Sequence, residues 1–392
     1  MHSSTFQRWL CFSVTAVILS IVVSIPAYAT SDDDLWSAAC AKVNQGRLAE
    51  ARPIFKRIVD FFPASRRAPG AQLKLAYIKM RLDQPTRQDM LDAFSAVKQK
   101  YPASDEAGEA LVRIGYIHSK SDTVEAIKDF SAFVTSRPNH PLNAEACQSL
   151  GRLYLRTHEL DKAETAFDRV KLISNADEHL VDEAALQSGF VKIMRFYASK
   201  DKTRLTAAIE AFDQLRASPK VNVRARADLG TAEALLLLGK PTEARAKYTA
   251  AVAAYSDNLY FRGIALYGVA CCSRHAGKLD DAVADYAALM AAMPGQTLAE
   301  KDAAWLSAAL ASTSTSAQIT IQENGSWTSL PGSEIVVESV YNRSKCLYLL
   351  KRYDEAIEKL NELVQYLPES NPLRAEAILL IEKCNRAKGR QQ

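Results

Sequence analysis

The chain has 392 residues, of which 48% are hydrophobic and 24% are charged, with only 15 glycines and 14 prolines. This composition is typical of a folded protein with a large core, and it excludes a disordered or low-complexity chain. The net charge is +4, and it falls by one, to +3, without Arg8, the one charged residue before Thr30. So small an excess gives no indication of nucleic-acid binding.

The first 29 residues differ in kind from the rest. Arg8 lies in a short polar start, residues 10–25 form an uncharged, mostly apolar run, and Ala27-Tyr28-Ala29 follows. This pattern predicts a cleavable secretory signal, cut after Ala29, and therefore a periplasmic or secreted protein. A helix over this run would reach about 24 Å, less than the ~30 Å hydrocarbon core of a bilayer, so a retained anchor is the weaker alternative. A lipoprotein would require a cysteine just after the run, and none stands there.

A short phrase then returns along the chain: a glycine, a small residue five positions later, and an aromatic residue four positions after that. Most steps between the small residues are 36 to 39 residues, whereas one is 45 and the last is 74, about two repeats. Such a period is typical of stacked helical pairs. The aligned positions are Ala51, Met90, Ala126, Ala163, Ala208, Ala244, Ala282 and Ala356.

Within each repeat the spacing is helical, since Ala163, Phe167 and Val170 stand at i, i+4 and i+7 and share one helix face. We expect the small residue to let two helix backbones approach, and the aromatic residue to fill the gap to the next pair. Prolines that deny the helix a further amide donor are expected to close repeats. They are Pro63, Pro102, Pro138, Pro294 and Pro368.

The first helix of a repeat is plainest around Gly151, twelve residues before Ala163. Here the chain resembles the tetratricopeptide repeat family, whose pattern is a bulky residue, Leu-Gly, Tyr, and later Ala and an aromatic residue. The matching residues are Cys147, Leu150, Gly151, Tyr154, Ala163 and Phe167. Val170 and Asn175 depart from the pattern, where the family usually has Ala and Pro. The resemblance implies an all-α, right-handed superhelical solenoid of helical hairpins, with the first helices lining its concave side.

The repeats are longer than the usual ~34 residues, and linkers such as Tyr101-Pro102-Ala103-Ser104 separate them. In this they resemble the periplasmic repeat proteins of bacterial envelope assembly. The resemblance implies an exported, non-enzymatic scaffold for protein–protein interaction, with peripheral association to the envelope. A glycan-binding or polysaccharide-export accessory protein is the alternative.

The sequence predicts a solenoid over residues 30–296 that is interrupted at 297–333. Residues 297–311 are expected to form an extra helix with Trp305 facing inward. Alternation in residues 318–322 and 326–330 around an Asn-Gly turn then gives a β-hairpin signal that carries Trp327. We expect this insertion to be a mobile surface loop, with a hairpin that docks on a partner or on the solenoid as the alternative. Residues 334–392 are expected to form the last repeat and a capping helix from Asn371 onward.

The chain offers no phosphate loop, nucleophile elbow, metal-ligand spacing or dinucleotide fingerprint, so we expect no enzyme, no cofactor and no metal. The six cysteines after residue 29 are scattered over separate repeats and are interpreted as small apolar core residues. A disulfide between Cys346 and Cys384 is the alternative, since an oxidising compartment allows disulfides. Redox chemistry at Cys271-Cys272 is the weaker, enzymatic alternative.

The resemblance implies that one or more partner proteins bind in the concave groove or on the inserted hairpin. Counting along the first helices gives candidate positions rich in arginine and tyrosine, which are common in binding hot spots. The candidates are Gln148, Arg152, Arg156, Tyr267, Arg274, Tyr341, Lys345 and Tyr348, with Trp327 on the hairpin.

Overall fold

The computed structural model describes residues 31–174, 176–312 and 334–390. Within these ranges all regular structure is helical, which confirms the predicted all-α solenoid of helical hairpins. The chain divides into an N-terminal unit, residues 1–129, and a C-terminal unit, residues 130–392. The predicted signal segment and the predicted hairpin with Trp327 lie outside the described residues.

The N-terminal unit consists of two complete helical pairs, a third first helix and the start of α6. Each second helix packs against its own first helix and against the next first helix. The helices are α1 (Asp32–Asn44), α2 (Leu48–Phe61), α3 (Ala68–Leu82), α4 (Arg87–Lys100), α5 (Asp105–Ser119) and α6 (Thr123–Ser136), and the boundary between the units falls within α6.

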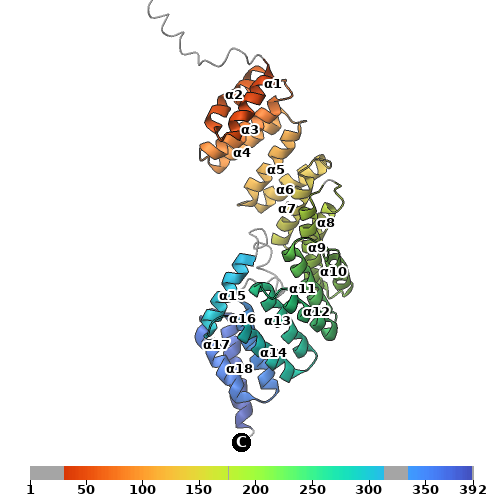
Figure 1. Ribbon diagram of the computed structural model, residues 1–392, viewed down its shortest axis with the longest axis vertical. Helices are drawn as coiled ribbons and strands as arrows, with labels where there is room; N and C mark the ends of the chain where they lie inside the picture. Colours follow the sequence, from red (N-terminus) through yellow and green to blue (C-terminus); the bar gives the residue numbers. More distant parts are fainter. Residues whose placement is uncertain (1–30, 175, 313–333, 391–392) are drawn as a thin grey trace, which may run out of the picture. The chain divides into compact units, whose positions relative to one another are not determined.

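The C-terminal unit has the same alternation of first and second helices, and Figure 1 shows α7 to α14 following one another in chain order. The helices are α7 (Asn143–Arg156), α8 (Leu160–Val170), α9 (Glu178–Ser199), α10 (Thr203–Asp213), α11 (Val221–Leu237), α12 (Pro241–Ala254), α13 (Leu259–His275), α14 (Leu279–Ala292), α15 (Leu298–Ser312), α16 (Glu334–Leu349), α17 (Tyr353–Tyr366) and α18 (Pro372–Gly389). First helices contact one another along the row α7, α9, α11, α13, α16, α18. Neighbours are closest on the inside of a curve, so we infer that first helices form the concave wall of this unit.

Helix α15 does not belong to the repeat pattern. Helix α14 packs directly on α16, as each other second helix packs on the next first helix, while α15 contacts α13, α16 and α17. The 74-residue step therefore does not hold a second full repeat among the described residues. The helix expected over residues 297–311 is present as α15, and Trp305 is buried on it.

In five of the eight aligned repeats, the turn between the two helices has a left-handed residue five positions before the small residue. Gly46, Gly239 and Gly277 take this position with φ of 74°, 83° and 73°. His158 and Lys351 take it in two other repeats with φ of 57° and 61°. Glycine adopts this conformation without the steric cost that a side chain adds, which explains the recurring glycine.

The predicted prolines mark the ends of second helices. Helices α2, α4, α6, α14 and α17 each end two residues before one of them, at Phe61, Lys100, Ser136, Ala292 and Tyr366. A residue that precedes proline is driven out of the helical region, so the chain turns toward the next repeat there.

The small and aromatic residues of the repeat are packed as predicted. Seven of the eight aligned small residues are fully buried alanines, whereas Met90 is only partly buried, and there Phe94 and Val97 supply the buried face. Phe212 is 1% exposed and lies between Gly189 of its own repeat and Gly230 of the next. A Cβ on Gly230 would stand 2.6 Å from the Phe212 ring, nearer than such atoms approach. Only glycine permits this approach of two helices.

Replacing Gly189 by alanine should lower the free energy of unfolding by about 1–3 kcal/mol, because the new methyl group would overlap the ring of Phe212. Gly389→Ala is the matched control, since nothing lies within 4 Å of its Cβ position. Chemical denaturation followed by circular dichroism measures both variants. Equal stability of the two variants would contradict this account of the packing.

Candidate functional site

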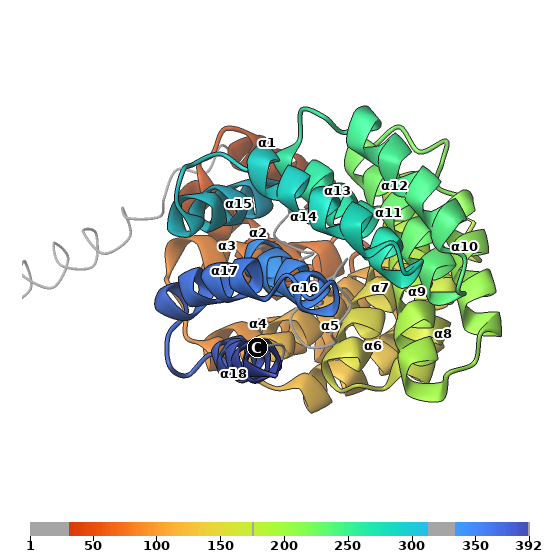
Figure 2. The same ribbon diagram turned by 90° about the horizontal axis from the view of Figure 1, so that it is seen from below.

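Three of the predicted partner-binding residues line one groove in the last repeat. Tyr341, Lys345 and Tyr348 stand at i, i+4 and i+7 of α16, so they share one face of that helix. The opposite wall is α18, which packs on α16 and α17 (Figure 2). The groove encloses about 410 Å³. Its other lining residues are Leu349, Glu376, Leu379, Leu380 and Lys383.

Helix α18 takes the position of a first helix beside α16 because of signals at its start. The Asn371 side chain accepts a hydrogen bond from the Leu373 amide at 2.9 Å, and Pro372 occupies the first helical position. Ala377, Leu380 and Cys384 are buried on its inner face at i, i+3 and i+7. The residues between them, which include Leu379 and Lys383, therefore lie toward the groove and solvent.

The charges of the groove are unequal. Burial and a hydrogen bond to Glu376 raise the pKa of Tyr341 to about 12, so the Glu376 carboxylate is already engaged. The ammonium group of Lys345 lies 5.2 Å from the centre of the Tyr341 ring, a cation–π contact. Neither Lys345 nor Lys383 forms an ion pair with another described residue. The lining thus carries two ammonium groups and one carboxylate, a formal net charge of +1.

Exposed apolar side chains accompany these lysines. Leu349 is 59% exposed and Leu379 is 54% exposed, and both line the groove. The Tyr348 ring packs 5.8 Å from the ring of Tyr353, which limits its motion. The arrangement offers an apolar surface beside two cations, which suits binding.

Two predicted residues are corrected by the structure. Gln148 and Tyr267 are each only 5% exposed, so neither presents a surface for a partner. Each first helix is flanked by the first helices of neighbouring repeats, and this covers positions that a single isolated helix would expose. Tyr267 accepts a hydrogen bond from Asn342 of α16 at 3.1 Å.

The remaining predicted residues lie apart from the groove. Arg274 is partly buried and donates a hydrogen bond to Asn342 at 3.2 Å, which ties α13 to α16. On α7, Arg152 is partly buried and Arg156 is exposed. Trp327 lies outside the described residues. The groove residues on α18 were missed because counting was confined to first helices of repeats.

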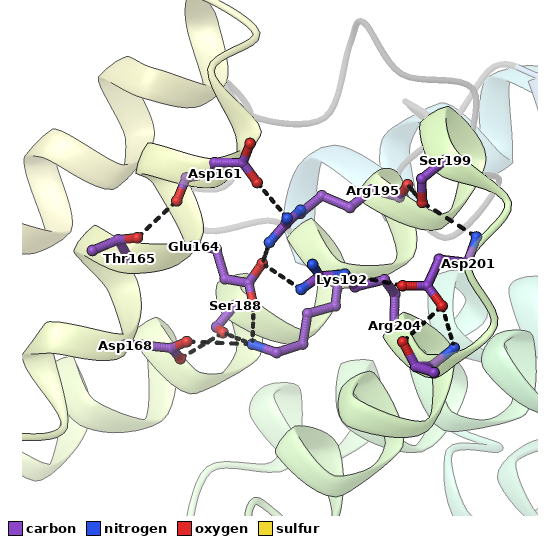
Figure 3. A network of polar contacts seen from close by, with 11 residues as sticks. Asp161, Glu164, Thr165, Asp168, Ser188, Lys192, Arg195, Ser199, Asp201 and Arg204 are labelled. Carbon is purple, nitrogen blue, oxygen red and sulfur yellow. Dashed lines mark hydrogen bonds and ion pairs between the residues drawn. The ribbon is translucent and has the colours of Figure 1, made fainter.

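A network of charged side chains joins α8 to α9, and Figure 3 shows it from close by. Glu164 is at its centre, with a carboxylate oxygen 3.2 Å from Lys192 and a second ion pair to Arg195. Lys192 is only 8% exposed, and its ammonium group also lies 3.5 Å from Asp168. A cation buried this deeply requires several oxygen partners.

The rest of this network leaves few charges unpaired. Ser188 donates a hydrogen bond to Asp168 at 2.7 Å. Burial alone would raise the pKa of Asp168, but Ser188, Lys192 and Lys171 outweigh it and lower that pKa. Arg204 lies 3.8 Å from Glu164. Cations and carboxylates offset one another, so we interpret this network as a structural joint and not as a binding site.

Glu164→Gln should lower the free energy of unfolding by roughly 3 kcal/mol, because Lys192 would lose its central partner while staying buried. Glu243→Gln is the matched control, since Glu243 forms an exposed pair with Lys240 at 3.3 Å that contributes less than about 1 kcal/mol. Thermal unfolding of both variants measures the difference. A Glu164 variant as stable as the control would show that the joint adds nothing to stability.

The described residues show no disulfide, no cluster of metal ligands and no helix that could span a membrane. All six cysteines between Cys40 and Cys384 are free thiols. No group of three or more His, Cys, Asp or Glu side chains in the described part of the chain could hold a metal ion. Within the same residues, the helices are too short or too polar for a membrane span.

Two segments match the family described as tetratricopeptide repeat, residues 194–259 and residues 338–370. No curated protein sequence matches the chain. The second segment contains the groove residues of α16.

Among solved structures, the chain is similar to a signal transduction ATPase with numerous domains from Pyrococcus horikoshii that carries a tetratricopeptide repeat sensor. The identity is 12% and the TM-score 0.50, over 86% of this chain and 50% of that chain. It is also similar to the C-terminal part of a repeat-containing protein from Cytophaga hutchinsonii, at 14% identity and a TM-score of 0.47 over 66% of this chain and 96% of that one. A tetratricopeptide repeat protein from Parabacteroides merdae shows 16% identity and a TM-score of 0.39, over 68% and 94%. At such identities the likeness concerns the fold alone.

Proposed function

We propose that this chain, which belongs to the tetratricopeptide repeat family, is a non-enzymatic scaffold that binds a partner protein in the groove between α16 and α18. The observation that carries the proposal is the composition of the groove. Two tyrosines, two exposed leucines and two lysines without carboxylate partners among the described residues face one hollow. Such a surface combines apolar contact area with charge selection.

The chemistry of the groove specifies the kind of segment that fits it. Leu349 and Leu379 can bury apolar side chains of a partner, while Lys345 and Lys383 can pair with its carboxylates. A partner segment with acidic and apolar side chains therefore fits best. The packed helices hold the groove in shape before binding, so less free energy is lost in ordering it.

Reversing the two lysines tests the groove. We expect Lys345→Glu with Lys383→Glu to reduce capture of the partner at least tenfold, because carboxylates would then be repelled. The probe is p-benzoylphenylalanine at position 348 of the full chain, crosslinked in the native cell, with captured proteins identified by mass spectrometry. Lys98→Glu with Lys120→Glu is the matched control, since both lysines are exposed and the change in net charge is the same.

Equal capture by the two double variants would exclude the groove as the docking site. The glycan-binding alternative depended partly on Trp327, outside the described residues. A change of tryptophan fluorescence on titration with envelope polysaccharide, without any captured protein, would favour that alternative.

We further propose that the scaffold is exported and acts in the assembly or organisation of a bacterial cell envelope. What supports this is the sequence of the first 29 residues, with Arg8 before an apolar run and Ala27-Tyr28-Ala29 after it. The longer repeats and their proline-containing linkers, which resemble those of periplasmic repeat proteins, support this compartment more than the role.

Cleavage of the signal gives a direct prediction. The protein purified from its native cell should begin at Thr30, because the small residues at 27 and 29 suit a signal peptidase. Mass spectrometry of the intact protein and of its N-terminal peptide measures this. Recovery of a chain that still contains residues 1–29 would contradict cleavage and support a retained anchor.

A further inference from the structure

Helix α15 is docked on a solenoid that continues without it. Because α14 already packs on α16, the repeats on either side do not need α15 to bury their facing surfaces. Figure 1 shows α15 (light blue) beside α16 and α17. Among the residues of α15 whose burial is described, Leu298, Asp302 and Trp305 are buried; they stand at i, i+4 and i+7 and so share one face of the helix.

The central contact of this face is the indole ring of Trp305, which is 0% exposed. It stacks on Tyr260 with ring centres 5.2 Å apart and an angle of 27°. Opposite it is Gly263 of α13, where any side chain would overlap the indole ring, and the Met293 side chain borders the same space. The absence of a side chain at residue 263 thus makes a seat for one large aromatic ring.

Hydrogen bonds hold α15 on either side of the Trp305 ring. Lys301 donates hydrogen bonds to the carbonyl oxygens of Met290 and Met293, at 2.9 and 3.0 Å, where α14 ends. The Tyr366 hydroxyl donates a hydrogen bond to Asp302 at 2.7 Å, where α17 ends. Helix α15 therefore contacts the ends of two second helices from different repeats.

The docking is incomplete in its hydrogen bonding. The Oδ1 atom of Asp302 and the indole N–H of Trp305 are buried without a hydrogen-bond partner among the described residues. Burial also raises the pKa of Asp302. Buried polar groups without partners oppose docking, and one of them here belongs to a carboxyl group on the buried face of α15. A helix with an apolar or amide group there would dock more strongly than α15 does.

From these contacts we infer that the surface beneath α15, formed by Tyr260, Gly263, Met293 and Tyr366, is a second docking site, which α15 occupies as an exchangeable internal ligand. The partner it fits is an amphipathic helix with an aromatic side chain for the seat. This partner helix has a side chain that accepts a hydrogen bond from Tyr366 three residues before its aromatic residue. A lysine stands directly before that side chain. This site is separate from the lining of the groove between α16 and α18.

A peptide with the sequence of residues 298–312, labelled with fluorescein, tests the seat by fluorescence anisotropy on the full chain. We expect the Trp305→Ala chain to bind this peptide at least tenfold more tightly than the wild-type chain, because its own α15 no longer fills the seat. Adding Gly263→Leu should abolish that binding, since the new side chain fills the same space. A peptide that itself carries Trp305→Ala is the matched control and should not bind.

Hydrogen exchange provides a measurement that loss of folding cannot imitate. In the wild-type chain the amides of α15 should exchange at least tenfold faster than those of α13 and α16. Asp302→Asn should slow exchange in α15 alone, because a neutral amide keeps an acceptor for Tyr366 and removes a buried carboxyl group.

Three results would overturn the inference. One is exchange of α15 at the rate of α16, and another is equal peptide affinity of the wild-type and Trp305→Ala chains. The third is a wild-type dimer in size-exclusion chromatography with light scattering that the free peptide dissociates. That dimer would assign the seat to α15 of a second copy instead of a partner helix.

Discussion

The whole structure depends on the contact between a buried aromatic ring and the bare backbone of a neighbouring helix. Phe212 sits between Gly189 and Gly230, and Tyr248 sits on Gly268 of the following repeat. Each contact joins two helices at a separation that a Cβ atom would not allow. A repeat buries its apolar face only against its neighbours, so these contacts maintain the order of the row.

Ion pairs, and not apolar contacts alone, hold α9 against α8 in that row. Helix α9 has 22 residues, and its extended C-terminal half carries Lys192 and Arg195 over α8. Apolar residues at these positions would fix the placement of α9 along α8 less strictly, because apolar contacts have no preferred direction. Ion pairs with Glu164 at the centre instead favour one placement of α9 on α8.

The two proposed docking surfaces lie where the repeat pattern ends or is interrupted. At the last repeat, α18 stands where a first helix would, and its exposed Leu379 and Lys383 face the groove with Lys345. Between α14 and α16 the pattern is interrupted by α15, whose Trp305 fills a seat left open by Gly263.

The sequence by itself determined the repeat, because its signals are local. A glycine with positive φ, an alanine five residues later and a proline two residues after the second helix each act within one hairpin, so the pairs and most of their buried faces could be predicted. Position along one helix also identified Tyr341, Lys345 and Tyr348 correctly as neighbours.

Only the tertiary structure decided which of the candidate surfaces is accessible. Gln148 and Tyr267 are buried, Tyr267 beside Asn342 of the distant α16. Glu376 and Lys383 reach the groove from α18, which the count along the first helices of repeats did not include. The place of α15, the pairing of Glu164 with Lys192 and the seat at Gly263 likewise depend on contacts between separate repeats. The physical reason is that helix periodicity specifies which residues share a face, whereas burial depends on what packs against that face.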